Sequence, residues 1–293
     1  MTDILTDFAQ ALAREDRAAN TIDSYLRDLR HFAHWFTQNN PDPFSPTAIT
    51  PMDLKDYRRH LLVQLRAKPA TVNRRLAALH RLCRWARAKG LIQDDPSEGI
   101  RGVEKERRLA PKALSRNQVH ALLRATQRHG SKRDVAIMQL LRNTGDRVGE
   151  LVALRLTDVE MSERKGKIVV RWGKGGRYRE VDLNLDARQA FGEYLAVRPA
   201  AADDHLFTGQ REAGLTVRAV ESLVTKYAWL AGLPEVTPHV LRHTFVKQLL
   251  DAGENLVTVA ALLGHSRLDT TAVYTRPNAQ DLEKAVNSLS EAE

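Results

Sequence analysis

The feature that most constrains how this chain folds is the stretch from residue 237 to residue 274, which carries three short amphipathic segments. Thr237 and Pro238 are typical of a helix start, because threonine caps free backbone amides and proline suits the first helical turn. Large apolar side chains then recur every four residues, at Leu241, Phe245 and Leu249. This spacing predicts a helix with one buried face, which leaves the polar residues of the stretch to form a site.

The polar residues that lie outside the apolar faces of this stretch include four of particular interest: His239, Arg242, His265 and Tyr274. His239 and Arg242 are three residues apart, so both side chains can point into one shared site from the same side of a helix. His265 follows Gly264, which is expected to end the second helix, and Tyr274 comes nine residues later. The stretch is therefore predicted to assemble a polar site on a helical scaffold.

The pattern of H-x-x-R-H, then Gly-His, then a tyrosine nine residues on resembles the C-terminal signature of the tyrosine recombinases, the integrase family that includes the Xer-type enzymes. His243 is the second histidine of this pattern. A zinc site of the H-E-x-x-H type is not indicated, because Val240 stands where that motif needs a glutamate. The resemblance implies that the four polar residues named above are catalytic and that His243 supports them.

Upstream, the segment TGDRVGEL at residues 144–151 resembles the T-G-x-R-x-x-E-L box of the same family, which supplies a first catalytic arginine. In this chain that arginine is Arg147, and Glu150 lies one helical turn later, where it can hold or orient the guanidinium. Asp146 departs from the family, in which an apolar residue is usual, and Gly149 replaces a common serine or alanine. Both departures are expected to affect local geometry more than chemistry.

Residues 157–184 predict β-strands. Two of these strands, at residues 167–172 and 178–183, flank the glycine-rich turn GKGG and predict a hairpin. The Gly-Lys pair of this turn is not a phosphate-binding P-loop, because the upstream glycine spacing and the following Ser or Thr are absent. It resembles the hairpin lysine of the family, which reaches the scissile phosphate, and this resemblance assigns Lys174 as a catalytic residue.

The first 90 residues contain four segments with helical apolar periodicity, which indicates a four-helix domain. Thr21 is expected to cap the second helix, and Thr50 with Pro51 is expected to open the third. The fourth helix is predicted at residues 69–89, with a buried stripe that consists of Val72, Leu76, Leu79 and Cys83.

The fourth helix and the residues just before it are strongly basic. Residues 66–89 hold eight lysines or arginines and no aspartate or glutamate, whereas solvated helix faces usually mix the two signs. We therefore expect contacts to DNA from Arg74, Arg75, Arg81 and Arg84. The alternative is that these arginines are only solvated. A formal net charge of +9 and a sequence pI of about 9.8 favour a polyanionic partner.

These patterns predict a mainly α protein with two domains. Residues 1–90 are expected to form an N-terminal four-helix DNA-binding domain, and residues 91–113 a basic linker. Residues 114–293 are expected to form a larger, mostly helical catalytic domain with a small antiparallel β-sheet. An amphipathic helix at about residues 279–290 is expected either to dock on a neighbouring protomer or to pack on its own domain.

The sequence also indicates in which cellular compartment the protein is expected. Its single cysteine, Cys83, excludes an intramolecular disulfide, which fits a reducing cytosol. The N-terminal residues lack the basic and apolar regions of a signal peptide, and no apolar run approaches the ~18 residues of a membrane span. We therefore expect a cytoplasmic protein with no membrane partner.

The resemblance implies a phosphoryl transfer that uses no metal, cofactor or ATP. Arg147 and Arg242 are expected to hold the non-bridging phosphate oxygens, because fixed bidentate cations stabilise the charge of the transition state. Tyr274 attacks the phosphorus and forms a covalent 3′-phosphotyrosine, while Lys174 protonates the leaving 5′-oxygen. The two catalytic histidines donate hydrogen bonds or move protons.

The resemblance further implies double-stranded DNA with paired half-sites as the substrate and a tetramer of this chain on that DNA. A paralogous recombinase or an accessory protein are further candidate partners. Two alternatives remain open. Residues 259–276 have the helix–glycine–helix pattern of a helix-turn-helix regulator without catalysis. A type IB topoisomerase would use the same chemistry to relax DNA instead of exchanging strands.

Overall fold

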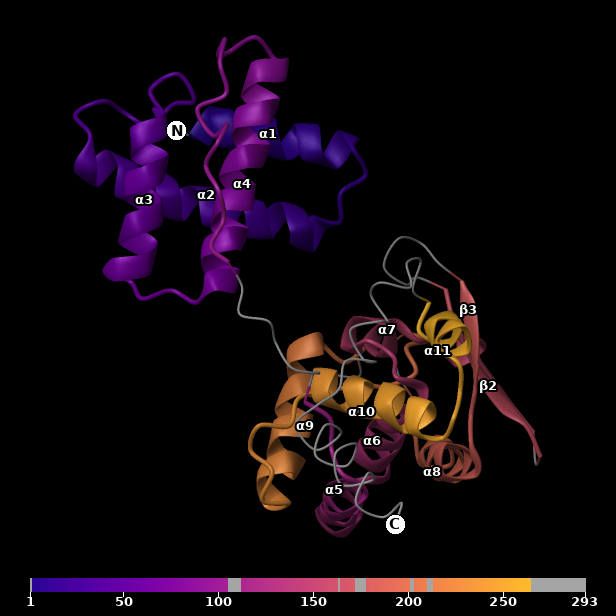
Figure 1. Ribbon diagram of the computed structural model, residues 1–293. Helices are drawn as coiled ribbons and strands as arrows, with labels where there is room; N and C mark the ends of the chain where they lie inside the picture. The colour runs from indigo at the N-terminus through magenta and orange to yellow at the C-terminus, as the bar shows by residue number, and fades with distance from the viewer. Residues whose placement is uncertain are drawn as a thin grey trace, which may run out of the picture. The chain divides into compact units, whose positions relative to one another are not determined.

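A computed structural model describes residues 2–104, 112–162, 164–171, 178–200, 203–209 and 213–264. The chain divides into two units, the first ending at residue 107 and the second beginning at residue 108. Each unit is organised around its own cluster of buried apolar residues (Figure 1). Within the described ranges, no helix is both long enough and apolar enough to cross a membrane.

Four helices build the N-terminal unit, as the sequence predicts: α1 (Thr2–Arg14), α2 (Ala19–Asn39), α3 (Pro51–Val63) and α4 (Pro69–Ala88). Their apolar faces meet around Phe32, whose ring lies edge-on to Tyr57 with 4.9 Å between the ring centroids. Both side chains are fully buried. The predicted stripe of α4 is buried as well, and consists of Val72, Leu76, Leu79 and Cys83. Burial of a large apolar side chain contributes roughly 1.5–3 kcal/mol, so these contacts determine how the four helices pack.

The chain continues to pack on the N-terminal unit beyond the end of α4. Ile100 belongs to the buried core of this unit. Asn73 of α4 exchanges two hydrogen bonds with the backbone of Val103, at 2.7 and 2.8 Å. The connection between the units therefore begins later than the predicted linker of residues 91–113, because α4 holds the first part of that segment.

Seven helices of the C-terminal unit are described: α5 (Arg116–His129), α6 (Lys132–Thr144), α7 (Val148–Ala153), α8 (Leu185–Leu195), α9 (Val217–Leu230), α10 (Pro238–Asp251) and α11 (Leu256–Leu262). Helix α6 is central, because it packs against α5, α8, α9 and α10. It is apolar on more than one face, as a helix surrounded by others must be. Its buried apolar residues are Ala136, Ile137, Met138, Leu140 and Leu141.

The C-terminal unit also contains the small antiparallel sheet that the sequence predicts. Its strands lie in the order β1 (Val159–Met161), β2 (Gly166–Val170) and β3 (Arg179–Asp182), and a 3-10 turn (Leu156–Asp158) precedes them. Ile168 of β2 lies opposite Val181 of β3, and both are buried. Helix α11 lies beside β3, so the chain that follows α11 starts close to this strand (Figure 1).

The helix starts follow the sequence with one exception. Thr50 and Thr237 cap α3 and α10 through side-chain hydrogen bonds, as predicted. Helix α2, however, begins at Ala19 after a cap residue, Ala18, that makes no side-chain cap bond, and Thr21 lies exposed in the first turn. The prediction of a cap at Thr21 is wrong, because alanine is the strongest helix former and allows the helix to start earlier.

Replacing Thr50 with alanine should lower the free energy of unfolding by about 1 kcal/mol, because the capping box of α3 is lost. In that box the Asp53 amide donates to Thr50 Oγ1 at 3.2 Å, and the Thr50 amide donates to the Asp53 carboxylate at 2.8 Å. Thr21→Ala is the matched control and should change stability by less than about 0.5 kcal/mol. Urea unfolding of the full chain, followed by tryptophan fluorescence, measures both; a larger loss for Thr21→Ala would contradict this cap assignment.

Candidate active site

The loop between α6 and α7 presents Arg147, and its shape depends on Gly145. Helix α6 ends at Thr144, and Gly145 takes a left-handed backbone conformation with a φ of 62°. A Cβ atom at this position would lie 2.5 Å from Cδ1 of Phe245 on α10, so glycine alone fits here. The loop is thereby packed against α10, and Arg147 follows as the N-cap residue of α7.

Glu150 holds Arg147 at two points. Its Oε2 accepts a hydrogen bond from the Arg147 backbone amide at 2.9 Å, and its Oε1 accepts one from Arg147 Nη1 at 2.8 Å. The side chain of Glu150 is 4% exposed, whereas that of Arg147 is 32% exposed and reaches the surface of the site. Although burial opposes it, hydrogen bonds from Arg179 and Arg147 hold the pKa of Glu150 below its usual value, so this carboxylate is charged at neutral pH.

Arg242 of α10 is buried and ties together two segments that are far apart in sequence. Its Nη1 donates to the carbonyl of Gly145, and its Nη2 donates to the carbonyl of Leu263 at 3.3 Å. Helix α10 fixes this side chain, because Thr237 caps the helix and Leu241 anchors it in the core. The guanidinium therefore joins the α6–α7 loop to the turn that follows α11.

A pocket of about 390 Å³ lies where these elements meet. Arg147, His239 and Arg242 all line it, so the structure brings together three residues of the predicted catalytic set. The other lining residues are Asp146, Val148, Glu221, Thr237 and Pro238. Two permanently charged guanidinium groups beside a histidine make this pocket suited to a phosphate.

The two histidines of α10 are neutral at neutral pH. Burial, Arg242 and Arg147 lower the pKa of His239, and burial, His239 and Arg242 lower the pKa of His243 to about 4. Their rings meet edge to face, with 4.5 Å between the centroids. A neutral imidazole donates one hydrogen bond and accepts another, so His239 is able to pass a proton within the pocket. In the ranges that the structure describes, no cluster of His, Cys, Asp or Glu residues is arranged to hold a metal ion.

Arg179 on β3 lies next to this site, although the sequence analysis did not identify it. Its Nη2 donates to Oδ1 of Asp146 at 2.6 Å and to Oε2 of Glu150 at 2.7 Å, and all three residues are buried. Burial raises the pKa of Asp146 to about 6, against the opposing charge of Arg179. The available signal was strand alternation, which places Arg179 on the same inward side as Val181. A charged residue at such a position needs a buried partner.

Three predicted catalytic residues lie outside the described residues: Lys174, His265 and Tyr274. The described chain ends close to them in sequence. In sequence, strands β2 and β3 lie on either side of the segment that contains Lys174, and Gly264 is the residue before His265. The catalytic roles of all three stay predictions.

Two of the predicted DNA-binding arginines of α4 share one buried carboxylate. Arg74 forms an ion pair with Asp28, whose side chain is 3% exposed. Nε of Arg75 lies 3.8 Å from the same carboxylate, and Nη1 of Arg75 donates to Nε2 of His31 at 3.0 Å. Because its side chain is 46% exposed, Arg74 faces solvent as well as Asp28, whereas Arg75 at 17% is mostly enclosed.

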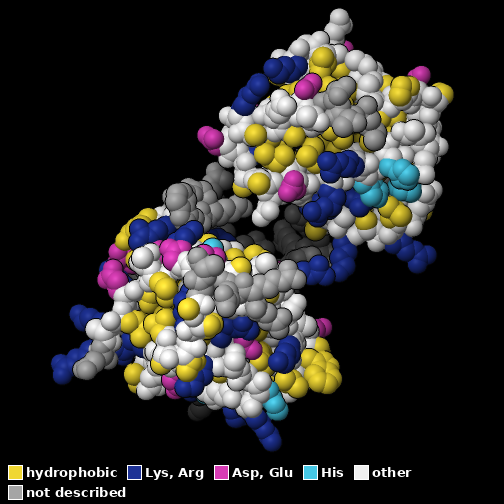
Figure 2. All heavy atoms as spheres, turned by 180° about the vertical axis from the view of Figure 1, so that it is seen from behind, with side chains coloured by type: hydrophobic (Ala, Val, Ile, Leu, Met, Phe, Trp, Pro, Cys, Tyr) yellow, Lys and Arg dark blue, Asp and Glu magenta, His cyan; other side chains and the backbone are white. Residues whose placement is uncertain are grey.

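The other two predicted DNA-binding arginines lie further along α4. Arg81 forms an ion pair with Glu15, whose side chain is 42% exposed, so this pair is open to water and to exchange. Nε of Arg84 donates to the carbonyl of His80 in its own helix at 3.3 Å. On the face of the N-terminal unit shown in Figure 2, lysine and arginine side chains gather beside histidines. DNA that approached α4 would therefore meet arginines that already have partners.

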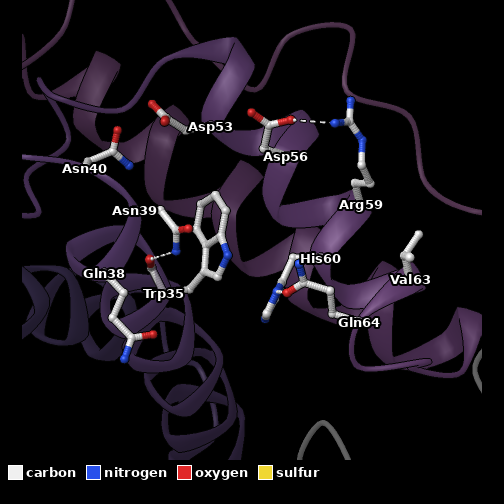
Figure 3. A pocket seen from close by; sticks show the side chains of 10 residues that line it. All are labelled: Trp35, Gln38, Asn39, Asn40, Asp53, Asp56, Arg59, His60, Val63 and Gln64. Atoms are coloured by element: carbon white, nitrogen blue, oxygen red, sulfur yellow. Dashed lines mark hydrogen bonds and ion pairs between the residues drawn. The ribbon is translucent and has the colours of Figure 1, made fainter.

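A larger pocket, of about 640 Å³, lies in the N-terminal unit between the end of α2 and α3 (Figure 3). Trp35 and His60 line it together with several side-chain amides. The one arginine among its lining residues, Arg59, forms an ion pair with Asp56 at 3.4 Å, which Figure 3 marks with a dashed line. This lining contains none of the predicted catalytic residues, whereas three of them line the 390 Å³ pocket of the C-terminal unit, which is therefore the candidate active site.

Comparisons with known proteins cover both units. Residues 112–281 match the phage integrase family, and residues 5–90 match the N-terminal SAM-like domain of phage integrases. Tyrosine recombinase XerC of Roseiflexus sp. (strain RS-1) is 34% identical over 98% of this chain and 93% of its own length. Tyrosine recombinase XerD of Ralstonia nicotianae is 34% identical over 94% of this chain and 89% of its own length. The crystal structure of XerA recombinase is 27% identical and covers 98% of each chain, with a TM-score of 0.56.

These matches do not favour the two alternatives, a helix-turn-helix regulator or a type IB topoisomerase. They agree with the geometry, in which the arginine of the TGDRVGEL segment and the histidine and arginine of α10 line one pocket. The chain therefore belongs to the phage integrase family, the family of the tyrosine recombinases.

Proposed function

We propose that this protein is a site-specific DNA recombinase that cuts and rejoins DNA strands through a covalent 3′-phosphotyrosine at Tyr274. The observation that carries the proposal is the pocket that Arg147, His239 and Arg242 line together. The names of the full-length relatives, the tyrosine recombinases XerC and XerD, support the same activity.

The two arginines act on the charge of the scissile phosphate. The pentavalent transition state carries more negative charge on its non-bridging oxygens than the ground state does, so fixed guanidinium groups stabilise it preferentially. Loss of one preorganised donor of this kind slows a reaction by about 10²–10³. Glu150 and the carbonyls of Gly145 and Leu263 hold the two guanidinium groups in place before the substrate arrives.

The bond changes balance without a further reactant. The oxygen of Tyr274 bonds to phosphorus as the bond from phosphorus to the 5′-oxygen breaks. The tyrosine proton passes to a neighbouring base, for which His239, which is neutral, and His265 are the candidates. Lys174 gives a proton to the leaving 5′-oxygen. Since the phosphotyrosine conserves the energy of the broken bond, the 5′-hydroxyl of a partner strand reverses the step and joins the new strands.

The rest of the chain serves this reaction by binding DNA and by bringing two recombination sites together. We assign DNA binding to residues 1–90 and catalysis to residues 114–293, with the helix at about 279–290 docking on a neighbouring protomer. Two DNA sites, each with a pair of half-sites, are brought together in this way in a tetramer, in which a paralogous recombinase or an accessory protein can take part. Because the substrate is DNA and the single cysteine, Cys83, is a free buried thiol, we propose a cytoplasmic location.

Tyr274→Phe should abolish covalent attachment to DNA and keep DNA binding, because the substitution removes the nucleophilic oxygen alone. The substrate is a pool of nicked duplexes with randomised sequence, from which SDS-resistant protein–DNA complexes are recovered and sequenced. Tyr178→Phe is the matched control, since Tyr178 is 61% exposed and should leave attachment intact. Covalent complexes formed by the Tyr274→Phe variant would contradict the proposal.

The arginines of α4 should control the salt dependence of DNA binding. Arg81→Ala should weaken binding and reduce the slope of log K against log salt by up to about 0.9, the value for one phosphate contact. Glu15→Gln should have the opposite effect, because it frees Arg81 from its ion pair. Asp7→Asn, which removes an equal charge from the exposed side of α1, is the control and should change the slope less. Fluorescence anisotropy with a labelled duplex measures the slope for all three variants. Unchanged slopes in the first two variants would indicate that the arginines of α4 are only solvated and do not contact DNA.

A further inference from the structure

Arg179 packs against three segments of the candidate active site. It is the first residue of β3, and its Nη2 contacts Asp146 and Glu150, which lie on either side of Arg147 in sequence. A Cβ atom at Gly264 would lie 3.3 Å from both Cδ and Nη1 of Arg179, so the guanidinium packs against that turn. Any movement of this guanidinium would therefore displace residues on both sides of the site.

Glu150 divides its two oxygens between two arginines. Its Oε2 accepts from Arg179 Nη2 and from the Arg147 amide, while its Oε1 accepts from Arg147 Nη1. An isolated arginine–carboxylate pair favours bidentate contact, in which both oxygens face one guanidinium. Asp146 accepts a second hydrogen bond from the same Nη2 of Arg179, so this nitrogen is shared between two carboxylates. Oε1 remains with Arg147.

Asp146 is an unfavourable residue at this place if stability alone is considered. It is 1% exposed, and its Oδ2 has no hydrogen-bond partner among the described residues. A buried carboxylate with an unsatisfied oxygen destabilises a protein unless something else compensates. It is also one of the two positions at which this chain differs from the usual residues of the TGxRxxEL box, the other being Gly149. Both observations favour a role in the reaction.

We propose that Asp146 is a positioning residue for DNA cleavage: by accepting a hydrogen bond from Arg179, it keeps Glu150 divided between Arg179 and Arg147 and so holds the Arg147 guanidinium toward the phosphate pocket. This proposal rests on the proposed function, in which Arg147 binds the scissile phosphate. Asp146 acts through Arg179 and Glu150, and it is itself 1% exposed. The matching guanidinium, Arg242, is held separately by carbonyl groups, so the effect concerns one of the two arginines.

This role is strongest when Asp146 is ionised, because a charged carboxylate accepts a stronger hydrogen bond from Arg179, and it therefore depends on pH. Burial raises its pKa to about 6, Arg179 opposes this, and Glu150 adds to it. The other charged or titratable groups around the pocket are Arg147, Glu221, His239 and Arg242. The arrangement is strongest above about pH 6 and weakens as the pH falls through that value. Because this folded-state pKa is raised, protonation of Asp146 favours the folded state, so acid does not unfold the protein through this group.

The test compares Asp146→Leu and Asp146→Asn with the wild type on the sequence recovered from the randomised pool. Single-turnover formation of the covalent complex, duplex affinity and Tm are measured from pH 5 to pH 8.5. For Asp146→Leu we expect cleavage to slow at least about tenfold at pH 8, with affinity within about twofold and Tm unchanged or higher. Asp146→Asn, which keeps an oxygen acceptor, should lose less rate and should lack the fall in rate that the wild type shows below about pH 6.

Asp134→Asn is the matched control. Asp134 is also a buried aspartate with an arginine partner, Arg133, but it lies at the opposite end of α6 from the Gly145 loop. It accepts a hydrogen bond from Tyr227 at 2.6 Å, so its loss should lower Tm without changing the cleavage rate of the folded protein.

A wild-type cleavage rate and pH profile in Asp146→Leu would overturn the inference while leaving the proposed function intact. If Asp146→Leu does not fold, Asp146→Asn becomes the test variant. A wild-type pH profile of the cleavage rate in Asp146→Asn overturns the inference as well. Failure of the wild type to form any covalent complex would instead refute the proposed function.

Discussion

The buried guanidinium of Arg242 makes the contacts on which the candidate active site depends. It donates to the carbonyls of Gly145 and Leu263, and so joins the loop after α6 to the turn after α11. These two acceptors are neutral, so they orient the guanidinium without cancelling its charge. A phosphate in the neighbouring pocket therefore meets a cation that is already in position, which is the condition for strong electrostatic stabilisation. Gly145 is indispensable here, because any side chain at that position would collide with Phe245.

The parts of the structure that follow local rules could be predicted from the sequence. Thr50 and Thr237 cap helices because a hydroxyl next to a helix start has few competing roles. The stripe of α4 from Val72 to Cys83 is buried because apolar residues at helical spacing form a single face, which packs against neighbouring helices away from water. His239, Arg147 and Arg242 meet in one pocket, and there the family pattern supplied a long-range contact that periodicity alone does not contain.

The parts that could not be predicted are contacts between distant charged residues. The pairs of Arg179 with Asp146 and of Arg74 with Asp28 join elements that no spacing rule relates. A sequence shows that a residue is charged, but burial and the partner decide whether that charge is exposed, neutralised or shared. The cap expected at Thr21 failed for a different reason, since a favourable alanine moved the helix start and removed the role of the threonine.

The acidic partners of α4 have a consequence for how such a protein finds its target. Asp28 and Glu15 already occupy Arg74 and Arg81, so a DNA phosphate that reaches these arginines replaces one anion with another. The gain in free energy for each contact is then small, and the protein is held weakly on sequences that offer nothing beyond phosphates. Weakly held proteins leave quickly. If α4 meets DNA, its carboxylates would shorten each unproductive stay and increase the length of chromosome that one molecule samples in a given time.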